Sequence, residues 1–194
     1  AGAHTGTFDG EVTGSVFGDD STILVDGINN KVVGDIDTAS LRTSETSIAL
    51  GNSAGETAQG VEAVAIGMNA ADDTQGTRAV ALGFYAGNAT QGSSAVAIGN
   101  TAGQTTQGIS AVAIGYRAGY TTQGISAVAI GNDTGKTTQG ASAVAVGPYA
   151  GEADQGQFGI AIGSAAGYTT QGVDGIAIGR QAGETTQGAD AVAL

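Results

Sequence analysis

From residue 51 onward, apolar and polar positions recur every 16 residues along the chain. The unit reads G-x-x-A-G-x-T-T-Q-G-x-S-A-V-A-I, and its clearest copy runs from Gly99 to Ile114. Glycine at position 1 returns without a slip from Gly51 to Gly179. Sixteen residues are too few for a helical pair but hold two short strands and two turns. The spacing predicts an all-β parallel β-solenoid of nine to ten 16-residue coils over residues 47–194.

Each A-V-A-I segment is expected to be a strand with two different apolar faces, because side chains alternate along a strand. In three neighbouring coils the strand residues are Val96, Ala97, Ile98, Val112, Ala113, Ile114, Val128, Ala129 and Ile130. Strands that are apolar on both faces are normally covered on both. One coil covers only its own interior, so the second face predicts an oligomer. Ala113→Asp should therefore be strongly destabilising, whereas Lys136→Asp should have almost no effect.

The T-T-Q-G segment is expected to face solvent, with its Thr and Gln columns forming ladders on a regular surface. The paired glycines are expected to form the turns, since glycine adopts positive φ freely. Ala71 stands where the other eight units carry glycine at position 5. That turn is expected to be strained or differently shaped.

Composition excludes several classes of protein. The chain of 194 residues has 35 glycines, one proline, no cysteine and a net charge of −12. Collagen needs glycine at every third position, and a disulfide scaffold needs cysteines. Nucleic-acid binding needs clustered cations, which the chain lacks, and no apolar run reaches the length of a membrane span.

No catalytic, cofactor or metal site is expected, and the chain is predicted not to be an enzyme. The segment 131–137, GNDTGKT, has three residues between its glycines, one fewer than a phosphate-binding loop requires. His4 is the only histidine, so triads and zinc sites lack partners. The aspartates of residues 19–37 do not have the spacing of an EF-hand loop, and we interpret them as turn and solubility residues, with a metal role left open.

The repeats SAVAIGNTAG (94–103), SAVAIGYRAG (110–119) and SAVAIGNDTG (126–135) resemble the head repeat of YadA-type trimeric autotransporter adhesins. That family has S-V-A-I-G followed by small residues and a second glycine turn. The resemblance implies a left-handed parallel β-roll and a homotrimer. The handedness comes from the resemblance alone, because the crossover rule favours right-handed connections. The usual adhesin unit is nearer 14 residues, so this unit is longer on its polar side.

Residues 1–46 differ in kind and are expected to form a small N-terminal connector. Segments 21–25 and 31–34 have the pattern of two strands of a β-hairpin. The stretch 6–36 is similar to a segment of virion fibre proteins of phages that infect marine cyanobacteria. This similarity implies a phage tail or virion fibre on the virion surface, with other fibre proteins as partners. The head of a bacterial autotransporter adhesin, on a bacterial surface, is the alternative.

Aromatic residues gather at variable turn positions of the repeat. A contact strip for a host glycan, a host protein or another virion protein is predicted there. Its members are Phe84, Tyr85, Tyr116, Arg117, Tyr120, Tyr149 and Tyr168. Tyrosine and arginine are favoured in such contacts, although decoration that caps the edge is the simpler interpretation. An ice-binding solenoid is a remote alternative suggested by the Thr column.

Overall fold

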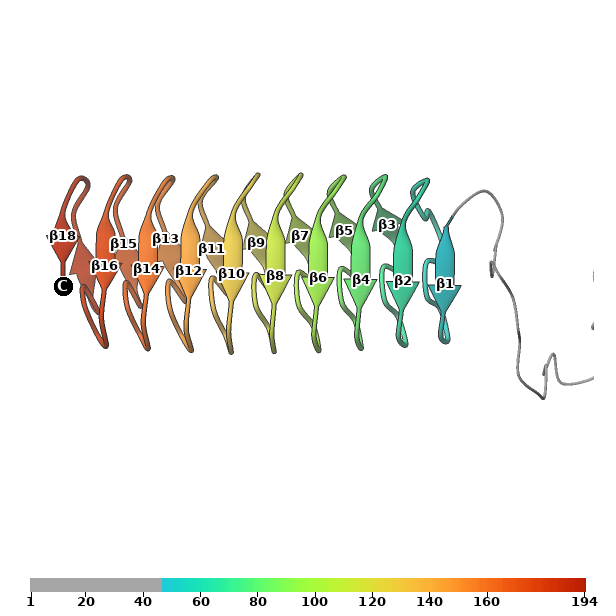
Figure 1. Cartoon of the computed structure of the whole chain (residues 1–194), viewed down its shortest axis with the longest axis horizontal. Helices are drawn as coiled ribbons and strands as arrows, with labels where there is room; N and C mark the ends of the chain where they lie inside the picture. The colour runs from blue at the N-terminus through green and yellow to red at the C-terminus, as the bar shows by residue number, and fades with distance from the viewer. Residues whose placement is uncertain (1–46) are drawn as a thin grey trace, which may run out of the picture. The chain divides into compact units, whose positions relative to one another are not determined.

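The computed structural model describes residues 47–194, which form a parallel β-solenoid of 16-residue coils (Figure 1). Within this range there are strands and turns but no helix. The predicted all-β parallel solenoid and its 16-residue repeat are therefore confirmed. The expected N-terminal connector, with its hairpin at 21–34, lies outside the described residues.

The A-V-A-I segments form one parallel sheet of ten strands, each paired with the strand of the next coil. The register is a shift of 16 residues, so Val96 pairs with Val112 and Ala97 with Ala113. Its strands are β1 (Ile48–Leu50), β2 (Val64–Ile66), β4 (Val80–Leu82), β6 (Val96–Ile98), β8 (Val112–Ile114), β10 (Val128–Ile130), β12 (Val144–Val146), β14 (Ile160–Ile162), β16 (Ile176–Ile178) and β18 (Val192–Ala193).

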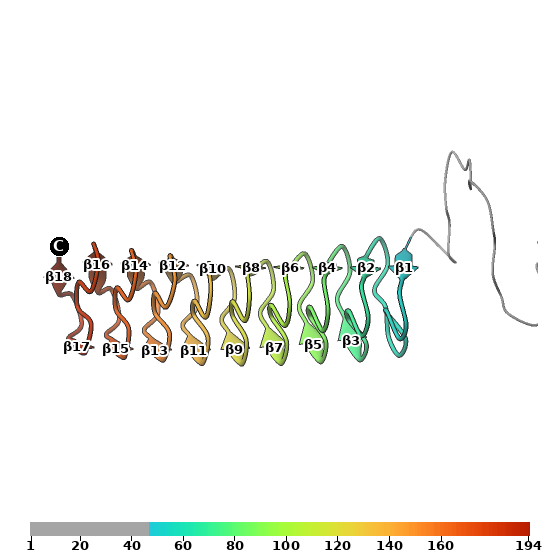
Figure 2. The same cartoon turned by 90° about the horizontal axis from the view of Figure 1, so that it is seen from below.

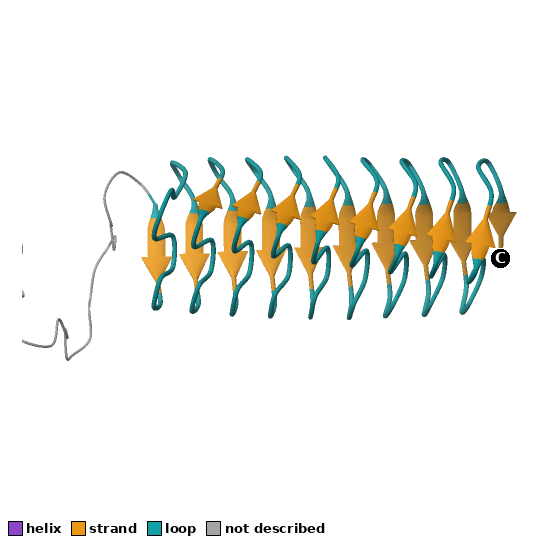
Figure 3. Ribbon diagram, turned by 180° about the vertical axis from the view of Figure 1, so that it is seen from behind, coloured by secondary structure: helices purple, strands orange, loops and turns teal. Residues whose placement is uncertain are grey.

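The T-Q segments form a second parallel sheet of eight strands, which Figures 2 and 3 show on the other side of the coil. Each strand has two residues, and the first coil contributes only a bridge between Ala58 and Thr74. The strands are β3 (Thr74–Gln75), β5 (Thr90–Gln91), β7 (Thr106–Gln107), β9 (Thr122–Gln123), β11 (Thr138–Gln139), β13 (Asp154–Gln155), β15 (Thr170–Gln171) and β17 (Thr186–Gln187).

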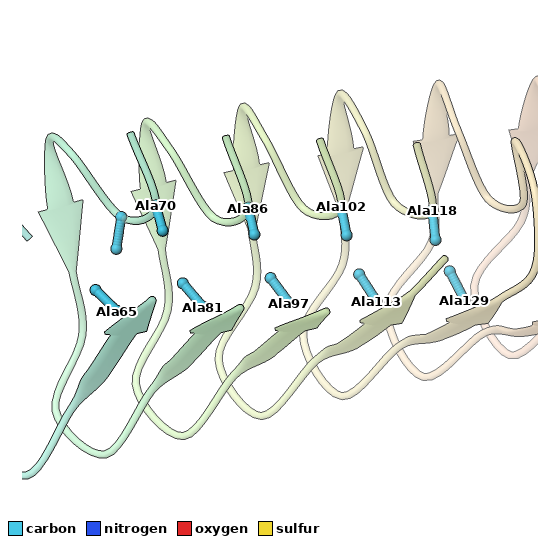
Figure 4. Close-up of a cluster of buried hydrophobic side chains, with 10 residues drawn as sticks. Ala65, Ala70, Ala81, Ala86, Ala97, Ala102, Ala113, Ala118 and Ala129 are labelled. Atoms are coloured by element: carbon cyan, nitrogen blue, oxygen red, sulfur yellow. The ribbon is translucent and has the colours of Figure 1, made fainter. Parts of the chain in front are cut away.

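Alanine fills the interior of the coil from both sides. Ala97 and its equivalents at position 15 point inward from the first sheet, toward Ala102 and its equivalents at position 4 (Figure 4). Ala113 and Ala129 are completely buried. The predicted burial of Ala113 is confirmed, and the structure shows that its face lies inside the coil, where a charge would have no room and no partner.

The prediction for glutamine was wrong: this column lies inside the coil, not on its surface. From Gln75 to Gln187 the position-9 side chains are only 1–6% exposed. Position 8 of the same strand points outward and is exposed, as at Thr106 and Thr122. A two-residue strand turns its two side chains to opposite faces, so one of the two polar residues had to enter the interior.

Each buried glutamine joins successive coils through its carboxamide. Nε2 of Gln107 donates to the carbonyl oxygen of Val96 at 2.8 Å and to Oε1 of Gln123 at 3.1 Å. The same pair of bonds recurs from Gln75 to Gln171. Buried polar groups cost free energy when they are unpaired, and here the donors and acceptors of neighbouring coils satisfy one another.

Both turns of the coil place a non-glycine residue at positive φ, which the sequence pattern did not indicate. Ser94 at position 12 has φ 59°, and Thr101 at position 3 has φ 54°. In each turn the next amide donates back to a glycine carbonyl, as from Ala95 to Gly92 at 3.2 Å. This is the sign pattern of a type II turn, whose third residue is usually Gly or Asn.

The glycine after glutamine has a different role from the predicted one. At Gly92 and Gly108 the φ angle is not positive, but an added Cβ would lie 2.6 Å from backbone of the next coil. Close stacking therefore requires glycine here, while the neighbouring turn residue takes the left-handed conformation.

Ala71 keeps the conformation of the glycines it replaces, with φ 49° against 54° at Gly87. The turn therefore has the regular shape, and the expected strain resides in an alanine held at positive φ. At Gly87 a Cβ would lie 2.9 Å from the carboxamide carbon of Gln91. The corresponding neighbour of Ala71 is Gln75, whose Oε1 is buried without a hydrogen-bond partner among the described residues. We attribute this gap in the glutamine ladder to the Ala71 methyl group.

Ala71→Gly is expected to stabilise the solenoid, because it removes the strain of positive φ and lets Gln75 accept a hydrogen bond from Gln59. The gain should be about 1 kcal/mol, which corresponds to a rise in melting temperature of about 2–4 °C for a chain of this size. Gly103→Ala is the matched reverse change and should lower the melting temperature. An unchanged melt for Ala71→Gly beside a loss for Gly103→Ala would contradict this explanation.

Candidate interaction surfaces

The predicted contact residues lie on one turn edge of the solenoid, at positions 2, 3 and 6 of the unit. Their turn follows the strands of the ten-stranded sheet, and the 16-residue register stacks the turns of successive coils. The most exposed of them is Tyr116, at 47%. Phe84, Tyr149 and Tyr168 are exposed, while Tyr85, Arg117 and Tyr120 are half-buried. We name this surface, positions 2, 3 and 6 of all coils, the aromatic edge.

Several side chains of the aromatic edge contact one another. The ring centroids of Phe84 and Tyr85 are 4.5 Å apart in an edge-to-face arrangement. The guanidinium of Arg117 lies 5.7 Å from the ring of Tyr116 and 5.2 Å from the ring of Tyr120. Such cation–π contacts hold the guanidinium against the two rings.

An ion-pair network continues from Arg117 along the next coils. Asp133 lies 3.3 Å from both Arg117 and Lys136, and Lys136 lies 2.9 Å from Glu152. Hydrogen bonding to Glu152 raises the pKa of Lys136 and, one coil further on, the pKa of Tyr168. The network therefore joins four coils on the aromatic edge, and its two cations and two carboxylates balance.

In the segment 131–137 the side chains of Thr134 and Lys136 already have protein partners. The Thr134 hydroxyl is buried and donates to the carbonyl oxygen of Gly147 at 2.6 Å. Lys136 is occupied by Asp133 and Glu152. The expectation that Lys136→Asp would have almost no effect is therefore contradicted, since a third carboxylate would replace the cation between two carboxylates.

The valine and isoleucine column forms a second surface, on the outside of the ten-stranded sheet. Positions 14 and 16 of each strand are half-buried or exposed, for example Val112 and Ile114, and Ile130 is 38% exposed. The predicted alternation is confirmed: alanine faces inward and the larger apolar side chains face outward. We name the side chains at positions 14 and 16 the outer apolar face.

A third surface, at the turn edge opposite the aromatic edge, was missed by the sequence analysis. Position 11 carries large apolar residues that are 45–55% exposed, namely Val61, Ile109, Ile125 and Val173, and Phe158 at position 12 is 50% exposed. Position 11 also holds Thr, Ser, Ala and Gln in other coils, so it does not appear apolar in the repeat pattern. We name these five residues the apolar edge.

The outside of the eight-stranded sheet is polar and narrow. Its two-residue strands direct one side chain outward, at position 8, and one inward. The exposed column is threonine except at Asp154.

Comparison of the chain with protein-family models, with curated proteins and with solved structures found no match. Among residues 47–194, no helix is long and apolar enough to cross a membrane. In the same range, no three His, Cys, Asp or Glu side chains are grouped in a way that could hold a metal ion.

Lys136→Asp is expected to lower the free energy of unfolding by about 1–2 kcal/mol, because it leaves Asp133 and Glu152 without their shared cation. Lys136→Gln is the control: it loses the ion pairs without adding repulsion, so its loss should be smaller. Since the folded-state pKa of Lys136 is raised above 10.5, its stabilisation is complete below that pH and is lost as the pH rises through the raised value. Thermal melts of the parent chain and both variants at pH 7 and pH 11 measure this: the difference between parent and variants should shrink at the higher pH. Equal melts of the three chains at pH 7 would contradict it.

Proposed function

We propose that this chain is a non-enzymatic, structural and adhesive fibre segment that works as a homotrimeric rod. One observation carries the proposal: the outer apolar face runs along every coil of a solenoid whose own interior is already filled with alanine. The outer apolar face continues over ten stacked strands with its side chains half-buried or exposed, whereas monomers rarely leave so long a contiguous apolar surface to water. A second and third copy of the same chain would cover it.

The coil structure supports a rigid spacer. Parallel strands stack at about 4.8 Å, so nine coils give a rod of roughly 43 Å. Every coil is held to the next by two backbone ladders and, from Gln75 onward, by the glutamine ladder. A rod of this kind is stiff, so its two ends stay at a fixed distance from each other. This suits a fibre that holds an attachment site away from a surface.

The aromatic edge supports the adhesive part of the proposal. Its tyrosines are exposed or half-buried, and the guanidinium of Arg117 is held against the rings of Tyr116 and Tyr120. In a trimer the edge occurs three times, so weak contacts with a host glycan, a host protein or another virion protein would add through multivalency.

The resemblance of residues 6–36 to phage fibre proteins favours a virion surface as the location. The S-A-V-A-I-G repeats support the second candidate, the head of a bacterial trimeric adhesin on a cell surface. Both share the trimer and the left-handed coil that the resemblance implies. The neighbouring genes discriminate between them: tail and baseplate genes favour the first, and an autotransporter barrel in the same reading frame favours the second.

The threonine column at position 8 supports an ice-binding solenoid only weakly. Ice-binding faces present regular parallel threonine columns. Here Asp154 interrupts the column at position 8, and the neighbouring position 7 is irregular, with an exposed Thr105 but alanine at Ala153. An ice-recrystallisation assay tests this third candidate directly.

The purified chain is expected to have a mass of three times 18.7 kDa in solution, because the outer apolar face needs a covering chain. Light scattering measures the mass, and circular dichroism shows whether the sample is β-rich. A folded, β-rich sample that stays at 18.7 kDa would overturn the proposed assembly.

Replacing Tyr116, Tyr120 and Tyr168 together with Ser is expected to weaken attachment of the oligomer to host cells or to its virion partner by about tenfold or more, because three copies lose the contact at once. The side chains lie on turns outside the alanine interior, so the secondary structure should be retained. Ser142→Ala, on the opposite turn edge, is the control. Attachment that is unchanged in a folded variant would reduce this segment to a spacer.

A further inference from the structure

The assembly proposed above does not specify which surface of a second chain covers the outer apolar face. The apolar edge of that chain is the surface that fits. We infer that chains assemble face to edge: the outer apolar face of one copy packs against the apolar edge of the next copy. The inference rests on the self-assembly proposed above and adds the partner surface.

The apolar edge has no conformational reason to be apolar. Ile109 and Ile125 occupy the second residue of a type II turn, a position that tolerates most residues and favours proline. In the coil between residues 83 and 98 the same position holds Ser93, with the same turn hydrogen bond from Ala95 to Gly92. The side chains of Ile109 and Ile125, which are 52% and 55% exposed, are therefore not needed to form the turn.

The two apolar surfaces have the same axial repeat, because both belong to the same coils. Ile109 and Ile125 stack directly, since the amide after Ile125 donates to the Ile109 carbonyl at 2.9 Å. Val112 and Val128 of the outer apolar face are in the same 16-residue register. Two chains that run in parallel can therefore repeat one apolar contact at the height of several coils.

Two different apolar surfaces on one chain favour a closed cyclic oligomer over a two-fold dimer. A two-fold dimer that packs face on face would cover the outer apolar face and leave Ile109, Ile125 and Val173 in water. A face-to-edge contact is heterologous, so each chain uses both surfaces, and three copies can close such a ring. The aromatic edge is opposite and carries the balanced ion pairs of Asp133 and Lys136, so it stays available for other contacts.

Disulfide trapping tests the contact, because the chain has no cysteine of its own. The variant Ile125→Cys with Ile130→Cys places one thiol on the apolar edge and one on the outer apolar face. Under mild oxidation it is expected to form covalent dimers and trimers, since a disulfide needs Cβ atoms within about 4.5 Å. Thr122→Cys with Ile130→Cys is the control, because Thr122 is exposed on the far sheet.

Ile109→Ser with Ile125→Ser is the second test, and the serine at Ser93 shows that the turn accepts it. The concentration at which the oligomer half-dissociates should rise about tenfold or more, whereas Tyr116→Ser should leave it unchanged. An oligomer that neither cross-links more than its control nor weakens with serine overturns the face-to-edge contact while leaving the assembly intact. A monomeric parent chain would instead overturn the proposed function itself.

Discussion

A carboxamide buried between two short strands connects the coils of this solenoid to one another. Nε2 of Gln123 donates to a carbonyl of the strand facing it and to Oε1 of Gln139 in the next coil. The same groups recur every 16 residues, so each glutamine requires its neighbour to be in register. A slip by one residue would turn glutamine outward and threonine inward, and would leave the buried acceptors without donors.

The thinness of the coil follows from the same arrangement. The space left between the glutamine column and the first sheet is filled by Ala97, Ala102 and their equivalents. Larger apolar side chains have no place inside, so valine and isoleucine occupy the outer face of the same strands. Because alanine already fills the interior, this solenoid carries its main hydrophobic surface on the outside. That exposed surface is the physical basis of the proposed assembly.

The positions that vary between coils form continuous surfaces, because the 16-residue register stacks the same position of successive coils in one column. Arg117 meets Asp133, and Lys136 meets Glu152, one coil apart. On the other turn edge Ile109 lies next to Ile125 in the same way. The invariant residues close the coil, and the residues that vary between coils give its two edges different chemistry: one is aromatic and charged, the other apolar.

The 16-residue period by itself determined the class of fold, the number of coils and the placement of Ala113 on the strand face opposite Val112 and Ile114, because repeat length and strand alternation are local properties. Both faces of the strand are apolar, so only the structure showed that the alanine face lies inside the coil. It could not place Gln123, since a polar T-T-Q segment read alone satisfies its hydrogen bonds equally well in water. The left-handed turn at Ser110 was also hidden, because only the closed coil forces positive φ on a residue that does not favour it. The tertiary structure alone showed that Lys136 is paired and that Ile125 is exposed beside Ile109, because both depend on residues 16 positions away that stacking brings into contact.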